Sequence, residues 1–269
     1  MTNFKNTNNA GDGVVHINEM TIWRGNRKIL DKFSMTVRPG DFLALIGSNG
    51  SGKTTILRAM TGFVPFQTGE LQLFGEKPRN FSTLRKRIGY VPQTIAIDYR
   101  LPFTVRDIVG IGRCGRAGLG RRLTKRDNEL IDIALADTGL TKLASRPIGH
   151  LSGGELQKTQ IARVLCQESE LLLLDEPTVG LDLGAQHDFL NLISTLHQKY
   201  TLTTILVMHD LASLPDQCKR AVVIDKSRKV FDGSLTGVFS PDILNLVYKK
   251  SSSIVTDGLI TLYGNKESE

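Results

Sequence analysis

The chain has 269 residues, of which 40% are hydrophobic and 23% are charged, and its formal net charge is +7. This length and composition are typical of a globular protein with one large domain, or with one domain and a subdomain. No apolar run approaches the roughly 18 residues that a membrane-spanning helix needs, so a role at a membrane would require a partner. The three scattered cysteines form no CxxC pair, which argues against a disulfide framework and a zinc site.

The first part of the chain predicts short strands around one helix. Residues 1–12, rich in Asn, Thr and Gly, predict a disordered tail. The segments VVHINEMTIW and KILDKFSMTV predict paired strands, and PGDFLALIG predicts a turn followed by a buried strand. A helix is expected over KTTILRAMTG, ending at Gly62, and two further strands over GELQLFG and RIGYVPQ.

The middle of the chain, from residue 94 to about 168, predicts mainly helices. Thr104 is followed three residues later by Asp107, and Thr124 by Asp127, which is a variant of the capping box that begins helices. Gly139 is expected to end the second of these helices.

The strand pattern resumes at ELLLLDEP. A helix should follow with Phe189, Leu192, Ile193 and Leu196 on one face, then a strand over TTILVMHD, a short helix and a strand over RAVVID. A further helix is expected near PDILNLVYKK, and SSIVTDGLITLY predicts a hairpin that turns at Asp257 and Gly258. Apolar strands that alternate with helices indicate an α/β fold with a mainly parallel sheet, interrupted by a helical insert.

A phosphate-binding loop is predicted where GSNGSGKTT follows a strand and opens a helix, the context that the motif G-x-x-x-x-G-K-[ST] requires. Lys53 is expected to reach the β and γ phosphates of a nucleotide, and Thr54 to hold Mg²⁺. The residues expected to bind the nucleotide here are Gly47, Ser48, Asn49, Gly50, Ser51, Gly52, Lys53, Thr54 and Thr55.

Polar residues at strand ends supply the remaining candidates for phosphate chemistry. Asp175 ends LLLLD, where it could hold Mg²⁺, and Glu176 could be the general base that orients the attacking water. Gln93, at the end of YVPQ, could reach Mg²⁺ or that water, or it could be an ordinary loop residue. His209, after TTILVM, could contact the γ-phosphate or have a structural role.

A second device suited to phosphate is expected at LSGGELQKTQIARVL. It begins with a hydroxyl, two glycines and an acid, and then continues with a helical pattern. The start of a helix attracts phosphate because its free N–H groups and its dipole favour negative charge.

The order of these motifs resembles the nucleotide-binding subunit of ATP-binding cassette (ABC) transporters, over roughly residues 14 to 240. The resemblance implies ATP and Mg²⁺ as cofactors and a head-to-tail homodimer in which Ser152, Gly153 and Gly154 contact the ATP held by the other copy. It also implies that GLDL, with Asp182, couples the two sites, that Gln93 senses a membrane partner, and that Gln93 and His209 are functional residues.

The domain organisation implied by the resemblance has a P-loop NTPase core with an antiparallel β-subdomain and an inserted helical subdomain. The tail would span residues 1–12 and the ATPase domain residues 13–240. Within that domain, 13–93 and 169–240 would form the core and 94–168 the helical subdomain. A C-terminal extension would follow over 241–269.

This chain differs from the family pattern at the position expected to contact adenine. Members of this family usually have an aromatic residue before a glycine near the N-terminus, whereas this chain has TIWRGNRK. Arg24 occupies the matching position and Trp23 lies one residue early. Because a slip of one residue in a strand moves a side chain to the other face, Arg24 is the better positional match, and adenine held by other contacts is the alternative.

The segments GYVPQTIAIDYRLPFTVRDIVGIGR and RPIGHLSGGE resemble the subgroup that serves zinc, manganese or iron importers. Iron-chelate and corrinoid importers have a sequence similar to VRDIVGIGR. The resemblance implies transmembrane permease subunits as partners, an extracytoplasmic substrate-binding protein as an indirect one, and a place at the cytoplasmic face of the membrane. A soluble cassette ATPase acting on DNA or ribosomes is the other hypothesis, suggested by the net charge. We expect no nucleic-acid partner, since the basic cluster from Arg113 to Arg126 has no interleaved aromatic residues.

Overall fold

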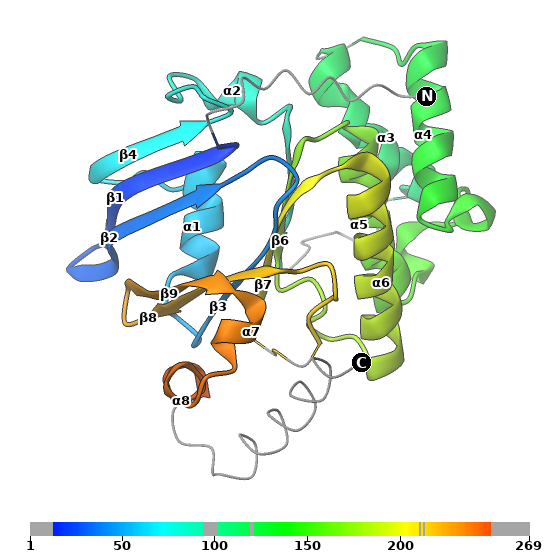
Figure 1. Ribbon diagram of the computed structural model, residues 1–269. Coiled ribbons are helices and arrows are strands. Elements are labelled where there is room, and N and C mark those ends of the chain that lie inside the picture. The colour runs from blue at the N-terminus through cyan, green and yellow to red at the C-terminus, as the bar shows by residue number, and fades with distance from the viewer. Residues whose placement is uncertain (1–12, 94–101, 119–120, 210, 212, 249–269) are drawn as a thin grey trace. The chain divides into compact units, whose positions relative to one another are not determined.

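The computed structural model describes residues 13–93, 102–118, 121–209, 211 and 213–248. Figure 1 colours the chain by residue number. The chain divides into two compact units. We call the described residues from 79 to 204 the helical unit, and residues 13–78 together with the described residues from 205 to 248 the strand-rich unit. The predicted N-terminal tail, the hairpin at Asp257 and Gly258, and residues 94–101 lie outside the described residues.

Two groups of strands form the strand-rich unit. The predicted N-terminal pair is confirmed: β1 (Val15–Arg24) pairs antiparallel with β2 (Arg27–Val37), and β4 (Thr68–Leu73) pairs with the other edge of β1. In the second group, β3 (Phe42–Gly47) is parallel to β8 (Arg220–Asp225), and β8 is antiparallel to β9 (Arg228–Ser234). The helices of this unit are α1 (Lys53–Met60), α7 (Leu235–Val238) and α8 (Pro241–Tyr248).

Burial explains the parallel pairing in the strand-rich unit. Every residue of β3 is buried, and so are five of the six residues of β8. A strand that is buried on both faces has a continuous apolar sequence, as FLALIG does. The strand β7 (Thr203–Met208), all of whose residues are buried, runs across the division of the chain into its two units.

The helical unit pairs β5 (Ile88–Val91) in parallel with β6 (Leu171–Asp175) and adds the helices α2 (Phe81–Leu84), α3 (Val105–Ala117), α4 (Lys125–Asp137), α5 (Gly153–Cys166) and α6 (Leu183–Tyr200). Two 3₁₀ turns lie at Thr141–Leu143 and Ile148–His150. Helices α3, α4 and α5 pack against one another around a core that includes Val109, Ile131 and Ala162 (Figure 1).

The predicted helix boundaries in this unit are confirmed. Thr104 and Thr124 are the N-caps of α3 and α4, and each forms a complete capping box with the aspartate three residues later. Each box satisfies two N–H groups that the first turn of a helix leaves free. Helix α4 ends two residues before Gly139, whose φ of 70° is the left-handed conformation typical of a helix terminus.

Several expectations need correction. No helix precedes β8 among the described residues 213–219, which form turns and irregular structure. In α6 the buried face includes Leu190, whereas Leu192 is half-buried. The strand β9 was not predicted, because RKVFDGS is polar and exposed along much of its length, as an edge strand often is. In the part of the chain that the structure describes, no helix combines the length and the apolar character needed to cross a membrane.

Candidate nucleotide-binding site

A glycine-rich loop joins the buried strand β3 to helix α1 in the strand-rich unit. A Cβ atom at Gly47 would lie 2.3 Å from the carbonyl oxygen of Ile224. Gly52 is the N-cap of α1 with a φ of 111°, and a Cβ atom there would lie 2.8 Å from Leu30 Cδ2. Both positions therefore require glycine, and the loop curls tightly before the helix begins.

The lysine of this loop lies inside the curl. Lys53 is 4% exposed, and its Nζ donates to the carbonyl oxygens of Gly47, at 2.8 Å, and Ser48, at 3.2 Å. The Ser51 hydroxyl is buried and has no hydrogen-bond partner among the described residues. Because glycine offers no side chain, Gly52 leaves the first N–H groups of α1 without a cap from the N-cap position.

This combination fits a phosphate group. A buried ammonium, a buried hydroxyl without a partner and an uncapped helix start supply donors in a small volume, and such a cradle suits phosphate oxygens. Asn49 and Gly50 are exposed at the bend of the loop. Thr54 and Thr55 are half-buried in the first turn of α1.

In the helical unit, Asp175 ends strand β6 and is completely buried. The Tyr90 hydroxyl donates to Asp175 Oδ2 at 3.1 Å. Tyr90 is paired with Leu173 in the parallel β5–β6 ladder, and Asp175 lies two residues further on the same face. The tyrosine was missed in the sequence, where the only signal for it is its place in the strand that leads to Gln93.

The next residue, Glu176, is joined to Gln93, which follows β5 at the same edge of the strand pair. Gln93 Nε2 donates to Glu176 Oε2 at 2.7 Å. Glu176 has a φ of 47°, a left-handed conformation that residues other than glycine seldom adopt. Backbone strain of this kind costs about 1–3 kcal/mol and is concentrated at functional sites. The structure therefore brings together the predicted base and the predicted glutamine.

The LSGGE segment forms the beginning of helix α5. Ser152 is the N-cap: its hydroxyl accepts from Glu155 N at 3.3 Å, and its own N–H donates to Glu155 Oε2 at 2.8 Å. That backbone hydrogen bond is the largest cause that lowers the pKa of Glu155. Ser152 and Gly153 are exposed and Gly154 is half-buried, so this helix start is open to a ligand.

The remaining predicted residues of the helical unit and of the strand-rich unit lie at element ends. Asp182 is the N-cap of α6 and accepts from Ala185 N at 2.9 Å. His209 follows β7 directly and is exposed. Arg24 and Trp23 are both exposed at the end of β1, and the Lys28 ammonium lies 5.1 Å from the centre of the Trp23 ring. One face of that ring is therefore already in contact with a cation.

The phosphate loop and the acid pair at a strand end are the features of a P-loop ATPase. The family model described as ABC transporter matches residues 30–179. The manganese transport system ATP-binding protein MntB of Bacillus subtilis is 32% identical to this chain, over 94% of this chain and 99% of MntB. The chain belongs to the ABC transporter family, and it is an ATP hydrolase.

Two further similarities agree with this. The zinc uptake system ATP-binding protein ZurA of Listeria innocua is 38% identical, over 82% of this chain and 86% of ZurA. The solved structure of cbiO1 from Clostridium perfringens, part of the ABC transporter complex cbiONQ, has a TM-score of 0.75 and 26% identity, over 87% of this chain and 93% of cbiO1. The predicted α/β fold of a P-loop NTPase is thereby confirmed.

Proposed function

We propose that this ATP hydrolase powers the import of a metal cation through a separate membrane permease. The manganese and zinc transport systems among the relatives support the import of a metal. The observation that most directly supports the catalytic step is the hydrogen bond from Gln93 to Glu176, whose backbone is strained and which follows the strand that Asp175 ends. An acid held in place by an amide suits the role of orienting a water molecule for attack on a phosphate.

The individual roles follow from the chemistry of the side chains. Lys53 would bind the β and γ phosphates, and His209 would contact the γ-phosphate. The hydroxyl of Thr54, the amide of Gln93 and the carboxylate of Asp175 are hard oxygen donors of the kind that Mg²⁺ prefers. When bound, Mg²⁺ would neutralise negative charge on the phosphate oxygens. Glu176 would accept the proton of the attacking water.

We further infer that the chain acts as a head-to-tail homodimer. The exposed start of α5, with Ser152, Gly153 and Gly154, would bind the γ-phosphate of the ATP that the other copy holds, and Asp182 would link the two sites. The chain would lie at the cytoplasmic face of the membrane, held there by the permease subunits, and an extracytoplasmic binding protein would deliver the cargo. The membership of cbiO1 in a transporter complex supports the expectation of a permease.

Replacing Glu176 by Gln tests the proposed base. This change keeps the size of the side chain and a hydrogen-bonding oxygen but removes the ability to accept a proton. We expect ATP binding to persist, steady-state hydrolysis to fall at least about a hundredfold, and a dimer to accumulate in ATP. Glu129→Gln, at an exposed position on α4, is the matched control and should hydrolyse ATP normally. Hydrolysis at nearly the wild-type rate in Glu176→Gln would rule out this residue as the base.

The nature of the cargo needs a separate measurement. The manganese and zinc systems among the relatives support a divalent cation. The sequence from Val105 to Arg113 resembles that of chelate importers, which supports the alternative of an iron chelate or corrinoid. Uptake of labelled manganese, zinc and iron chelate should be compared in cells with and without this chain. A selective loss of chelate uptake would replace the cation proposal by the alternative.

A further inference from the structure

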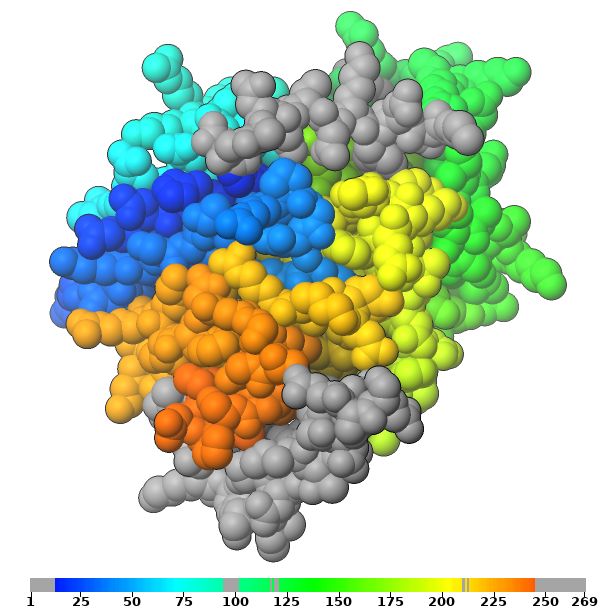
Figure 2. Space-filling view, viewed as in Figure 1, coloured from blue at the N-terminus to red at the C-terminus, as the bar shows by residue number. Residues whose placement is uncertain are grey.

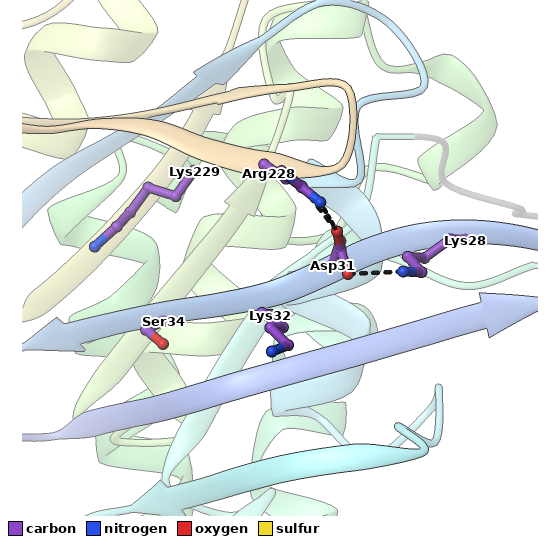
Figure 3. Close-up of a pocket in the computed structure, with 6 residues that line it drawn as sticks. All are labelled: Lys28, Asp31, Lys32, Ser34, Arg228 and Lys229. Atoms are coloured by element: carbon purple, nitrogen blue, oxygen red, sulfur yellow. Dashed lines mark hydrogen bonds and ion pairs between the residues drawn. The ribbon is translucent and has the colours of Figure 1, made fainter.

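The strand-rich unit contains a second basic site that its phosphate loop does not account for. A pocket of about 530 Å³ lies beside strands β2 and β9 (Figure 3). Four cationic side chains and one carboxylate line it, which gives the lining a formal charge of +3. The lining residues are Lys28, Asp31, Lys32, Ser34, Arg228 and Lys229.

A bulge in β2 brings adjacent side chains into this pocket. Leu30 and Phe33 are both completely buried although they are three residues apart, so the strand does not alternate regularly between them. Lys32 adopts a φ of 50°, and its N–H donates to the Thr21 hydroxyl at 3.2 Å. The additional residue leaves both Asp31 and Lys32 on the outer face, as a β-bulge does when it redirects a side chain.

Hydrogen bonds hold the turn before β9 against β2. Lys226 and Ser227 form this turn with φ values of 45° and 71°. The Asp31 N–H donates to the Ser227 carbonyl oxygen at 2.8 Å, and the Ser227 hydroxyl donates to the Lys28 carbonyl oxygen at 3.1 Å. Figure 2 shows the blue surface of β2 and the orange surface of β9 side by side and open to solvent. The pocket is therefore built by fixed backbone on both sides.

The single carboxylate of the pocket is already neutralised. Asp31 accepts from Lys28 Nζ at 2.8 Å and from Arg228 at 2.6 Å, one cation at each oxygen (Figure 3). The hydrogen bond from Lys28, followed by that from Arg228, lowers the pKa of Asp31, so this carboxyl group is ionised at neutral pH. Asp31 therefore has little capacity to balance the other two cations.

The other two cations differ in their partners. Lys229 forms an ion pair with Asp232 at 2.9 Å, and the same carboxylate also binds Arg220 at 2.8 Å. Within the described part of the chain, the Lys32 ammonium has no hydrogen bond or ion pair. The Ser34 hydroxyl, two residues along the same face as Lys32, accepts from Glu19 N at 2.9 Å and keeps its own hydrogen for another acceptor.

We propose that this pocket binds an anion that carries a phosphate group. A strained backbone that presents an uncommitted ammonium beside further cations indicates a ligand with more than one negative charge. Phosphate has several acceptor oxygens in different directions, which suits donors that come from two strands, whereas a single carboxylate has two oxygens in one plane. The group could belong to a soluble polyphosphate or to the headgroup of an anionic lipid.

The test uses inorganic pyrophosphate for the soluble source and vesicles that contain phosphatidic acid for the lipid source. Pyrophosphate is titrated calorimetrically into the full-length protein with its phosphate loop saturated by ADP, and vesicle binding is measured by flotation against phosphatidylcholine vesicles. The pocket variant is Lys32→Ala with Lys229→Ala. The control variant, Lys77→Ala with Lys219→Ala, removes the same charge from exposed positions of this unit outside the pocket.

We expect one of the two probes to bind the wild type and the control with similar affinity, and to bind the pocket variant at least about tenfold more weakly. Equal affinity of all proteins for ADP would show that the variants are folded. Binding of pyrophosphate would identify a soluble ligand, and binding only of phosphatidic acid would identify a lipid headgroup. The proposal is overturned if neither probe binds, if the pocket variant binds like the wild type, or if both variants weaken binding equally.

Discussion

Removal of the Arg113 guanidinium should strongly destabilise the helical unit. Arg113 is 7% exposed on α3 and donates to Asp127 Oδ1 at 2.8 Å, to Glu168 Oε2 at 2.8 Å and to the Cys166 carbonyl oxygen at 2.9 Å. These contacts join α3 to α4 and to the end of α5. Arg113→Met would keep most of the apolar stem but remove the cation that Asp127 and Glu168 share, while Arg116 would remain 3.9 Å from Glu168.

The expected magnitude is about 3–5 kcal/mol in the free energy of unfolding, as is typical when one partner of a buried ion pair is removed. With a urea dependence of about 3 kcal/mol per molar, the unfolding midpoint should fall by roughly 1 M or more. Arg116→Met is the matched control, three residues after Arg113 and one residue before the end of α3. Its side chain is 36% exposed and donates to main-chain oxygens of Gln167 and Glu168, so its loss should cost about 1 kcal/mol.

The difference between the two variants should also depend on pH. The backbone and hydroxyl of Thr124, and then Arg113, lower the pKa of Asp127 from 3.8 to about 2. A carboxyl group whose pKa is lower in the folded state than in the unfolded state stabilises the folded protein. This stabilisation is complete above the pKa of the unfolded state, and it is lost as the pH falls through the pKa of the folded state. The loss in free energy of unfolding caused by Arg113→Met should therefore become smaller as the pH falls from about 4 to 2, because a protonated Asp127 carries no charge for the arginine to balance.

Urea unfolding followed by circular dichroism, with hydrogen exchange of α3 to α5, provides the measurement. A midpoint for Arg113→Met no lower than that for Arg116→Met would refute the reasoning. So would a cost that stays constant as the pH falls towards 2.

Two further changes test the nucleotide contacts. Ser152→Arg should leave ATP binding to one copy largely intact but block ATP-driven dimerisation and hydrolysis, because a large cation replaces the exposed N-cap of α5. If this variant still dimerises with ATP, Ser152 does not contact the ATP of the other copy. Arg24→Ala should weaken ATP binding, by roughly threefold to tenfold, more than Trp23→Ala does, since Lys28 already covers one face of the Trp23 ring. The reverse order in an equilibrium titration would make Trp23 the adenine contact.

Local patterns in the sequence were sufficient for much of the fold. The capping boxes at Thr104 and Thr124 involve residues only three positions apart, and the phosphate loop is one continuous segment. The burial of β3 follows from its unbroken apolar run. Strand β9 lies at the edge of its sheet and is largely exposed. It was missed because its polar residues show no hydrophobic pattern of this kind.

The sequence by itself therefore determined the α/β class, the phosphate loop, the helix starts and the family resemblance, since each depends on near neighbours along the chain. Only the tertiary structure decided which distant residues meet. Gln93 reaches Glu176, and Tyr90 reaches Asp175, because β5 and β6 pair in one particular register. The basic pocket depends on a bulge in β2 and on a turn almost 200 residues later in the chain. Strand register and long-range pairing result from the packing of the whole unit, so a linear pattern does not specify them.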